Sequence, residues 1–429
     1  MESKKQTFVE KIASKLLPIS EKLNNNKYLG SMRDGFYYAM PLIIVGSLFL
    51  IFPNFPIPAV VKWVNKTFGT TWIDYCNRAY NFSVGIMTIF VIIGIAKSLA
   101  NRYKKDEVQF IINSILAFML VTPETLIKDN SFIPMANFQA QGLFVGMIIA
   151  FCACDLTNWV LNKHWTIKMP DSVPANVANS FEGLVPTAFV MIVFTLIFFL
   201  FKITPFKDAQ TCISKLIQIP LEGLGASLPA TLFLEFLMTL LFSLGLHGPN
   251  IVGAVTTPIW TALTIQNANA YAKGQPVPNI INAQFDGNFV RLGGTGATFG
   301  LIILLLFFAK SKQYKSLGKL AAAPSIFNIN EPLIFGLPIV MNPIMMIPFI
   351  FSPIVFGGLT YLVVRLGLVP PANGINLPWT MPPVISGLFL SGWRGAVWQL
   401  VEIIISVGWY YPFFKVADKE AWLKEQGKD

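Results

Sequence analysis

The sequence predicts an all-α membrane protein, with nine or ten transmembrane helices and re-entrant hairpins in its C-terminal half. Two observations support this fold class. The 429-residue chain is 54% hydrophobic and only 13% charged, whereas soluble proteins carry roughly 25% charged residues. Several apolar stretches also reach the roughly 20 residues that a helix needs to cross a bilayer. A soluble core does not require so many such stretches.

The first half of the chain is predicted to contain five regular spans separated by short polar loops. They cover residues 35–52, 81–100, 108–125, 142–161 and 184–201. Lysine and arginine residues precede the first span and follow the second, and such residues mark cytoplasmic flanks. The basic, amphipathic segment 1–34 lacks an apolar core followed by a small-residue cleavage site, so it is not interpreted as a cleaved signal peptide. We therefore expect a cytoplasmic N-terminus.

The second half is more often interrupted by proline, glycine and polar residues, which places a domain boundary near residue 215. Segment 203–227 mixes charged and apolar residues, as in a helix on the membrane surface or a simple connector. Spans are expected at residues 228–246, 292–309, 342–364 and 395–414. Two apolar stretches, 251–265 and 377–392, are short or broken by proline, which favours re-entrant hairpins beside a pathway.

These boundaries predict four segments along the chain. They are a cytoplasmic segment 1–34, a five-helix domain 35–215, a transport domain 216–415 and a polar tail 416–429. One crossing per span places the lysine-rich loop "AKSKQYKSLGK" outside, which conflicts with the positive-inside rule. A missed half-span in the second half would remove the conflict.

The formal net charge of +10 does not indicate a nucleic-acid partner, because the basic residues lie in the tail and in loops beside apolar segments. They are interpreted as topology signals. The four cysteines show neither a disulfide framework nor metal-ligand spacing; they are Cys76, Cys152, Cys154 and Cys212. We expect no metal ion and no cofactor.

Carboxylates at membrane depth are the first candidates for function. Each costs about 2.5–3.5 kcal/mol on insertion scales, so it needs a partner, a wet cavity or a role. The candidates are Asp155, Glu235, Glu331 and Glu402. For all except Glu331, pairing with a neighbouring helix or an interface lysine is the favoured interpretation.

Glu331 differs because it lies in "FNINEPLIFGLP", beside Asn328, Asn330 and Pro332. Proline frees backbone carbonyls and the amides add donors and acceptors, a combination that binds a polyol. Further prolines follow, which predicts an interrupted helix exposing binding groups midway across the membrane. The alternative is a kinked packing helix whose glutamate pairs internally.

A second cluster is "LGLHGPNIVG", in which His247 follows a long apolar span and precedes Gly248, Pro249 and Asn250. The helix must break there. A lone histidine is more often structural than functional. Here a titratable ring coincides with a helix break at membrane depth, which favours a functional role.

A third cluster, "NGINLPWTMPP", offers Asn373, Asn376 and Trp379. Tryptophan rings stack on sugars, although Trp379 fits an interfacial anchor equally well. The stretch "FDGNFVRLGGTGATFGL" misses both nucleotide-binding glycine spacings, and Gly296 and Gly300 are expected to permit close helix packing. Arg291 before them is a cation that could meet an anion near the site.

"GLHGPN" followed by "NINEPLIFG" resembles the membrane component, enzyme IIC, of the bacterial sugar phosphotransferase system, in its lactose, cellobiose and diacetylchitobiose family. The resemblance covers essentially the whole chain. It implies a homodimer in the bacterial plasma membrane, with the first five helices at the dimer contact and the sugar held by the second half. It also implies that a β-linked disaccharide, cellobiose or diacetylchitobiose, crosses the membrane. It further implies that the sugar receives a phosphoryl group on its 6-hydroxyl from a phosphocysteine of a separate IIB protein, with IIA as an indirect partner.

The resemblance implies that Glu331 and His247 bind this hydroxyl, with Glu331 as general base. The sugar-binding residues are then predicted to be Asn330, Asn328, Asn250, Trp379, Asn376 and Arg291. Basic loops such as "NRYKKDE" and "LNKHWTIKMPD" are candidates for docking IIB, or are simple topology signals.

Two other function classes are compatible with parts of the pattern. In a proton-coupled secondary sugar transporter, Glu331 and Glu235 would carry protons. In an intramembrane enzyme, the same histidine and glutamate would act on a lipid-linked substrate, but nothing in the sequence calls for that.

Overall fold

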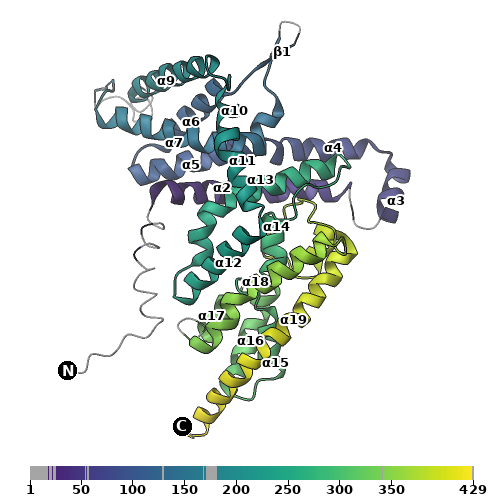
Figure 1. Cartoon of the computed structure of the whole chain (residues 1–429). Coiled ribbons are helices and arrows are strands. Elements are labelled where there is room, and N and C mark those ends of the chain that lie inside the picture. The colour runs from purple at the N-terminus through teal and green to yellow at the C-terminus, as the bar shows by residue number, and fades with distance from the viewer. Residues whose placement is uncertain are drawn as a thin grey trace, which may run out of the picture.

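The computed structural model describes residues 18, 22, 26–53, 55, 58–127, 130–167, 169–170, 181–337, 339 and 342–427. Most of the predicted N-terminal cytoplasmic segment therefore lies outside the described residues. Within them the chain is mostly helical (Figure 1). The described residues also contain one antiparallel pair of short strands, β1 (Thr125–Ile127) and β2 (Asn130–Phe132).

The five spans predicted for the first half are all helical. They correspond to α2 (Lys27–Ile51), α5 (Met87–Tyr103), α6 (Glu107–Val121), α7 (Ala140–Asn162) and α9 (Leu184–Lys202). Between the first two lie α3 (Pro58–Phe68), α4 (Thr71–Asn81) and η1 (Val84–Ile86), and η2 (Met135–Phe138) precedes α7. Helix α5 packs against α2, α6 and α7, and these helices form the upper layer in Figure 1.

The second half is built from shorter and more irregular elements. They are α10 (Ala209–Ile213), η3 (Ser214–Gln218), α11 (Ile219–Gly225), α12 (Leu228–Ser243), α13 (Gly248–Ala272), α14 (Ala283–Phe285), η4 (Asp286–Val290), α15 (Phe299–Phe307), α16 (Lys312–Ile326), α17 (Glu331–Gly336), α18 (Pro343–Arg365) and α19 (Ile385–Glu425). Helix α13 connects the two halves, because it packs against α2 and α7 of the first half and against α12 and α14 of the second.

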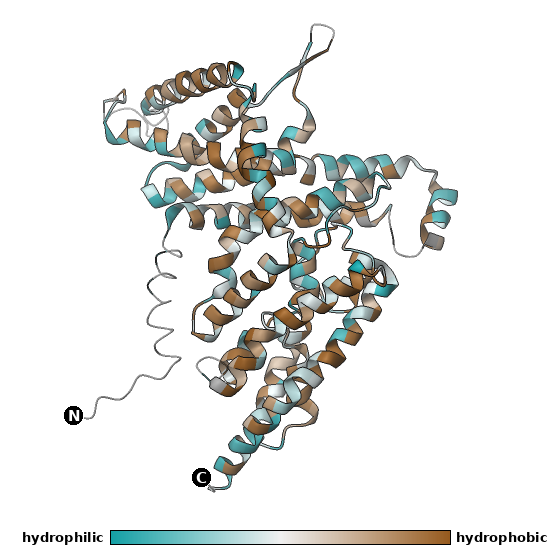
Figure 2. Ribbon diagram, in the orientation of Figure 1, coloured by the Kyte–Doolittle hydropathy of each residue, from teal (hydrophilic) through white to brown (hydrophobic). Residues whose placement is uncertain are grey.

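Long apolar helices support a membrane-spanning protein. Among the described residues, 5 helices are long and apolar enough to cross a membrane, or up to 6 if the pair Ala209–Gly225 and Leu228–Ser243, bent by 76°, counts as one span. Figure 2 shows hydrophobic residues along α9, whereas the C-terminal end of α19 is hydrophilic. The total of nine or ten spans stays a prediction.

The predicted span 292–309 is wrong. Helix α15 has 9 residues, and at 1.5 Å per residue it covers about 14 Å, less than half of a hydrocarbon core of roughly 30 Å. The residues before it form turns, in which Gly293, Gly294 and Gly296 have φ angles of 82°, 98° and 84°. Helices α15 and α16 pack against each other as a hairpin. The lysine-rich loop at its tip therefore needs no full crossing.

The two predicted re-entrant hairpins have different outcomes. Residues 251–265 do not form a hairpin, because they lie within the continuous helix α13, which accommodates Pro258. Proline is tolerated in membrane helices where neighbouring groups satisfy the freed carbonyl. Within 377–392 the chain does reverse, at Ser391 and Gly392. Gly387 consequently packs so closely on the helix after the turn that a Cβ atom would lie 2.6 Å from the Gly395 carbonyl oxygen.

The predicted close packing at the glycine-rich stretch is confirmed. A Cβ atom on Gly300 would lie 2.2 Å from the backbone nitrogen of Val407 in α19, and one on Gly296 would lie 2.4 Å from the Phe349 ring. These contacts hold the loop before α15 against α18 and the start of α15 against α19.

Candidate functional site

A cavity of about 410 Å³ lies between α2 and the elements of the second half. Small-molecule sites typically enclose about 300–1,000 Å³. All eight residues predicted for the site line this cavity: His247, Asn250, Arg291, Asn328, Asn330, Glu331, Asn376 and Trp379. The fold therefore gathers four separate stretches of sequence around one space.

His247 lies at the predicted helix break, between the end of α12 and the start of α13. Its Nδ1 accepts a hydrogen bond from the backbone N–H of Asn250 at 3.3 Å, and its ring lies 5.1 Å from that of Phe242. Because Nδ1 is an acceptor, the neutral ring carries its proton on Nε2. The Asn250 side chain accepts a hydrogen bond from the Tyr37 hydroxyl of α2 at 3.2 Å.

Glu331 is the first residue of α17. In the described part of the chain it forms no ion pair, and its Oε2 is buried without a hydrogen-bond partner. A buried carboxylate oxygen without a partner is costly unless a ligand supplies a donor. The alternative of a glutamate paired internally is therefore not supported.

Asn328 uses its whole side-chain amide to hold the loops around the cavity. Its Oδ1 accepts from the Gly293 N–H at 2.9 Å, and its Nδ2 donates to the carbonyls of Trp379 at 2.8 Å and Met381 at 3.0 Å. Its φ of 60° lies in the left-handed region, which asparagine tolerates better than most residues. The structure thus assigns Asn328 a structural role beside Glu331.

Asn330 and Asn376 use only part of their side-chain amides in hydrogen bonds within the protein. Asn330 donates from Nδ2 to the Thr295 carbonyl and to the Thr298 hydroxyl, both at 2.8 Å. The Oδ1 of Asn376 accepts from the Gln284 amide at 2.7 Å. Each has a remaining polar atom that can contact a sugar.

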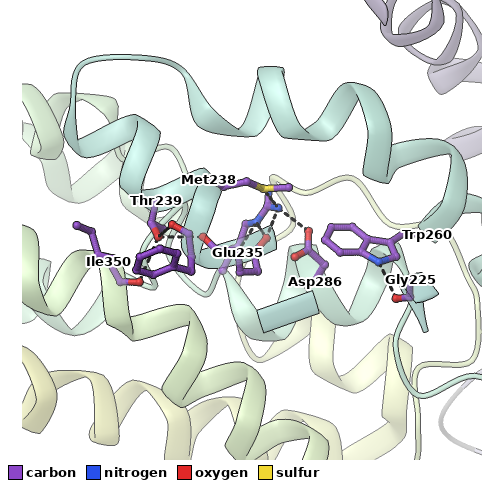
Figure 3. A network of polar contacts seen from close by, with 9 residues as sticks. Gly225, Glu235, Met238, Thr239, Trp260, Asp286 and Ile350 are labelled. Atoms are coloured by element: carbon purple, nitrogen blue, oxygen red, sulfur yellow. Dashed lines mark hydrogen bonds and ion pairs between the residues drawn. The ribbon is translucent and has the colours of Figure 1, made fainter. Parts of the chain in front are cut away.

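Arg291 is already neutralised by two carboxylates. Its Nη2 lies 2.5 Å from Glu235 Oε1 and 2.9 Å from Asp286 Oδ2, and Figure 3 shows this polar network. The expectation that Glu235 pairs with a helix partner is therefore confirmed. Arg291 lines the cavity as a paired cation rather than a free one.

The other two acids also have partners. Asp155 pairs with Lys27 at 3.6 Å and accepts from the Tyr28 hydroxyl at 2.7 Å. Glu402 is fully buried; its Oε1 accepts a hydrogen bond from the Thr360 hydroxyl, whereas its Oε2 has no hydrogen-bond partner and the residue does not line the cavity. The described residues contain no group of histidine, cysteine or acidic side chains that could hold a metal ion.

Sequence reasoning missed several residues of the cavity wall. They include Tyr37 of α2, Thr256, Thr257, Trp260 and Thr261 of α13, and Gln284 and Asp286. Helix α2 was expected to be a regular span, and α13 was divided by the wrong hairpin prediction. Asp286 carried a usable signal, because it is an acid in the same apolar stretch as Arg291.

The family model for phosphotransferase system, EIIC, matches residues 33–353. The chain belongs to this family. It is 40% identical to the lichenan permease IIC component of Bacillus subtilis (strain 168), over 97% of this chain and 94% of that protein. It is also 40% identical to the cellobiose-specific EIIC component of Geobacillus stearothermophilus, over 98% of this chain and 96% of that protein.

A solved structure agrees with this assignment. The crystal structure of the transporter ChbC, the IIC component from the N,N'-diacetylchitobiose-specific phosphotransferase system, matches with a TM-score of 0.94 and 38% identity, over 99% of this chain and 100% of that one. The EIIC chain described here is therefore an integral membrane permease that acts on a sugar together with a IIB protein. This membership favours the permease over a proton-coupled secondary transporter.

Proposed function

We propose that this EIIC component translocates a β-linked disaccharide, cellobiose or diacetylchitobiose, and presents its 6-hydroxyl for phosphorylation by IIB. The names of the cellobiose-specific and N,N'-diacetylchitobiose-specific relatives support this substrate class. The observation that carries the proposal is the buried, unpartnered Oε2 of Glu331 in a cavity that it shares with His247.

In the proposed reaction Glu331 is the general base. The 6-hydroxyl oxygen attacks the phosphorus of the phosphocysteine on IIB, so that an O–P bond forms and the S–P bond breaks. The hydroxyl proton moves to Glu331, and the thiolate leaves with IIB. His247 donates from Nε2 to the sugar and orients the hydroxyl, because its Nδ1 is occupied by the Asn250 N–H.

The remaining predicted residues form the sugar-binding wall. The Trp379 side chain is 50% exposed, so its ring is free to stack on a sugar. Asn250, Asn330 and Asn376 contribute their uncommitted polar atoms. Asn328 and Arg291 act mainly by holding neighbouring groups in place.

The proposal extends to the organisation of the chain. Residues 35–215 form a dimerisation domain and residues 216–415 a transport domain, in a homodimer with a cytoplasmic N-terminus in the bacterial plasma membrane. The position of the cavity supports this division, because α2 is the one element of the first half among its lining residues. Exposed apolar side chains on α9, such as Ile192, Leu196 and Phe199, suit contact with lipid or with a second copy.

Binding and phosphorylation measured together test the proposal. Calorimetry on the purified protein should show tight binding of cellobiose or diacetylchitobiose, with lactose as comparison. Membrane vesicles containing the protein should form sugar phosphate only when phosphorylated IIB is present. Sugar that accumulates unmodified in cells with intact IIA and IIB would contradict the proposal. A protonophore that abolishes uptake, with no effect of IIB loss, would instead support the secondary transporter.

A further inference from the structure

Asp286 lies in the cavity wall but has no part in the phosphoryl-transfer chemistry proposed above. It is 6% exposed. Its Oδ2 pairs with Arg291 at 2.9 Å, whereas its Oδ1 is buried without a hydrogen-bond partner. A buried acceptor left unsatisfied costs about 1–3 kcal/mol, and more when the group is charged. A ligand donor arriving in the cavity would remove this cost.

Arg291 is shared by two acidic side chains, of which one borders the cavity. Its guanidinium faces the carboxyl groups of both Glu235 and Asp286. Glu235 is fully buried and does not line the cavity, whereas Asp286 does. In Figure 3 the Asp286 side chain lies between Glu235 and the Trp260 indole. The acceptor available to a ligand is therefore on Asp286.

The local backbone holds Asp286 rigidly. It begins the π-helical segment η4, and such segments are frequent at functional sites. The Asn282 side chain caps the preceding turn by accepting from the backbone N–H groups of Gln284 and Phe285, at 2.9 and 3.0 Å. Gln284 in turn donates to Asn376 on the opposite loop. Asp286 is thus placed by a network of hydrogen bonds rather than by a mobile loop.

We infer that Asp286 is a second sugar-binding carboxylate of the cavity. Its Oδ1 accepts a hydrogen bond from a hydroxyl or an acetamido N–H at a sugar position other than the 6-hydroxyl. This inference rests on the proposed function and adds a specificity-determining contact to it. Arg291 holds Oδ2 of Asp286, so Oδ1 is the atom that receives the sugar's donor, and Asp286 acts on sugar affinity.

A matched pair of variants tests the inference. Asp286→Asn and Glu235→Gln each replace one carboxyl group by an amide and leave Arg291 with one acidic partner, but only Asp286 borders the cavity. Calorimetry should show at least a tenfold loss of disaccharide affinity, about 1.4 kcal/mol, in Asp286→Asn. Glu235→Gln should change the affinity less than threefold. Asp286→Glu keeps a carboxyl group but displaces the acceptor, and it should also lose at least tenfold in affinity.

Deoxy sugars identify the contact itself. A deoxy analogue that lacks the hydroxyl bound by Asp286 should bind the wild-type protein at least tenfold more weakly than the intact sugar does. The Asp286→Asn variant should bind the analogue and the intact sugar equally well. For an acetamido contact, replacing that group by hydroxyl serves the same purpose. Equal losses in Asp286→Asn and Glu235→Gln, or full affinity in Asp286→Glu, would overturn the inference while the proposed function stands. Failure of the wild-type protein to bind any disaccharide would overturn both.

Discussion

The two halves of the molecule treat their carboxylates differently. In the first half, Asp155 pairs with Lys27 and accepts from Tyr28, and both side chains of the ion pair are about 40% exposed. In the second half, Glu331 and Asp286 each leave a buried oxygen unpartnered, and both line the cavity. Depth in the membrane alone therefore does not mark a functional acid. A functional acid is marked instead by a buried carboxylate oxygen that has no hydrogen-bond partner and lies beside a cavity.

The backbone shows the same contrast. Regular helices such as α5 and α7 satisfy their own N–H and C=O groups and pack through side chains. Around the cavity, the loop of Gly293 and Gly294 and the turn at Asn328 adopt left-handed conformations. Interrupted backbone of this kind is tolerated at membrane depth where it is buried in protein or lines a cavity. The first half supplies the frame and the second supplies the binding groups.

The largest expected effect is that of Glu331→Gln, which keeps the side-chain volume but removes the base. The rate of sugar phosphorylation should fall by about 10²–10⁴-fold, the usual contribution of general base catalysis, while affinity changes far less. Vesicle phosphorylation assays with IIB and calorimetry measure the two quantities. Glu402→Gln is the control, because Glu402 is a buried acid that does not line the cavity. Equal loss of binding and rate in Glu331→Gln would reduce Glu331 to a binding group.

Asn328→Ala should have the largest effect on stability. It leaves the Gly293 N–H and the carbonyls of Trp379 and Met381 without their side-chain partner. At about 1–3 kcal/mol for each buried group left unsatisfied, the free energy of unfolding should fall by about 3 kcal/mol. Denaturation followed by tryptophan fluorescence measures it. Asn250→Ala, which removes one side-chain hydrogen bond at 3.2 Å, is the control. Equal effects would mean that Asn328 does not hold the loops.

The smallest effect is expected for Asp155→Asn. The ion pair with Lys27 is half-exposed, and such pairs contribute about 1 kcal/mol or less. Phosphorylation should proceed at the wild-type rate, and the unfolding free energy should change by no more than about 1 kcal/mol. A large drop in the phosphorylation rate at unchanged stability would place a functional acid in the first half. The two halves would then not differ in how they use their carboxylates.

The predictions from sequence succeeded where the signal was local. The membrane-protein class, the five helices of the first half and the helix break at His247 follow from composition, apolar length and the Gly-Pro pair. The span 292–309 failed, because apolar residues in tight turns resemble apolar residues in a helix. The hairpin 251–265 failed, because the apolar stretch is short and contains Pro258, whereas α13 continues through this proline as far as Ala272.

What the sequence by itself determined is the kind of chain and the chemistry it carries: a helical membrane permease with a histidine and a glutamate at breaks in its apolar segments. These features depend on residue type and on near neighbours. The tertiary structure decided how the polar groups are used. It saturated the amide of Asn328, gave Arg291 two carboxylate partners and left oxygens of Glu331 and Asp286 free in one cavity. Such pairings depend on distances between segments far apart in sequence, and these distances exist only once the helices have packed.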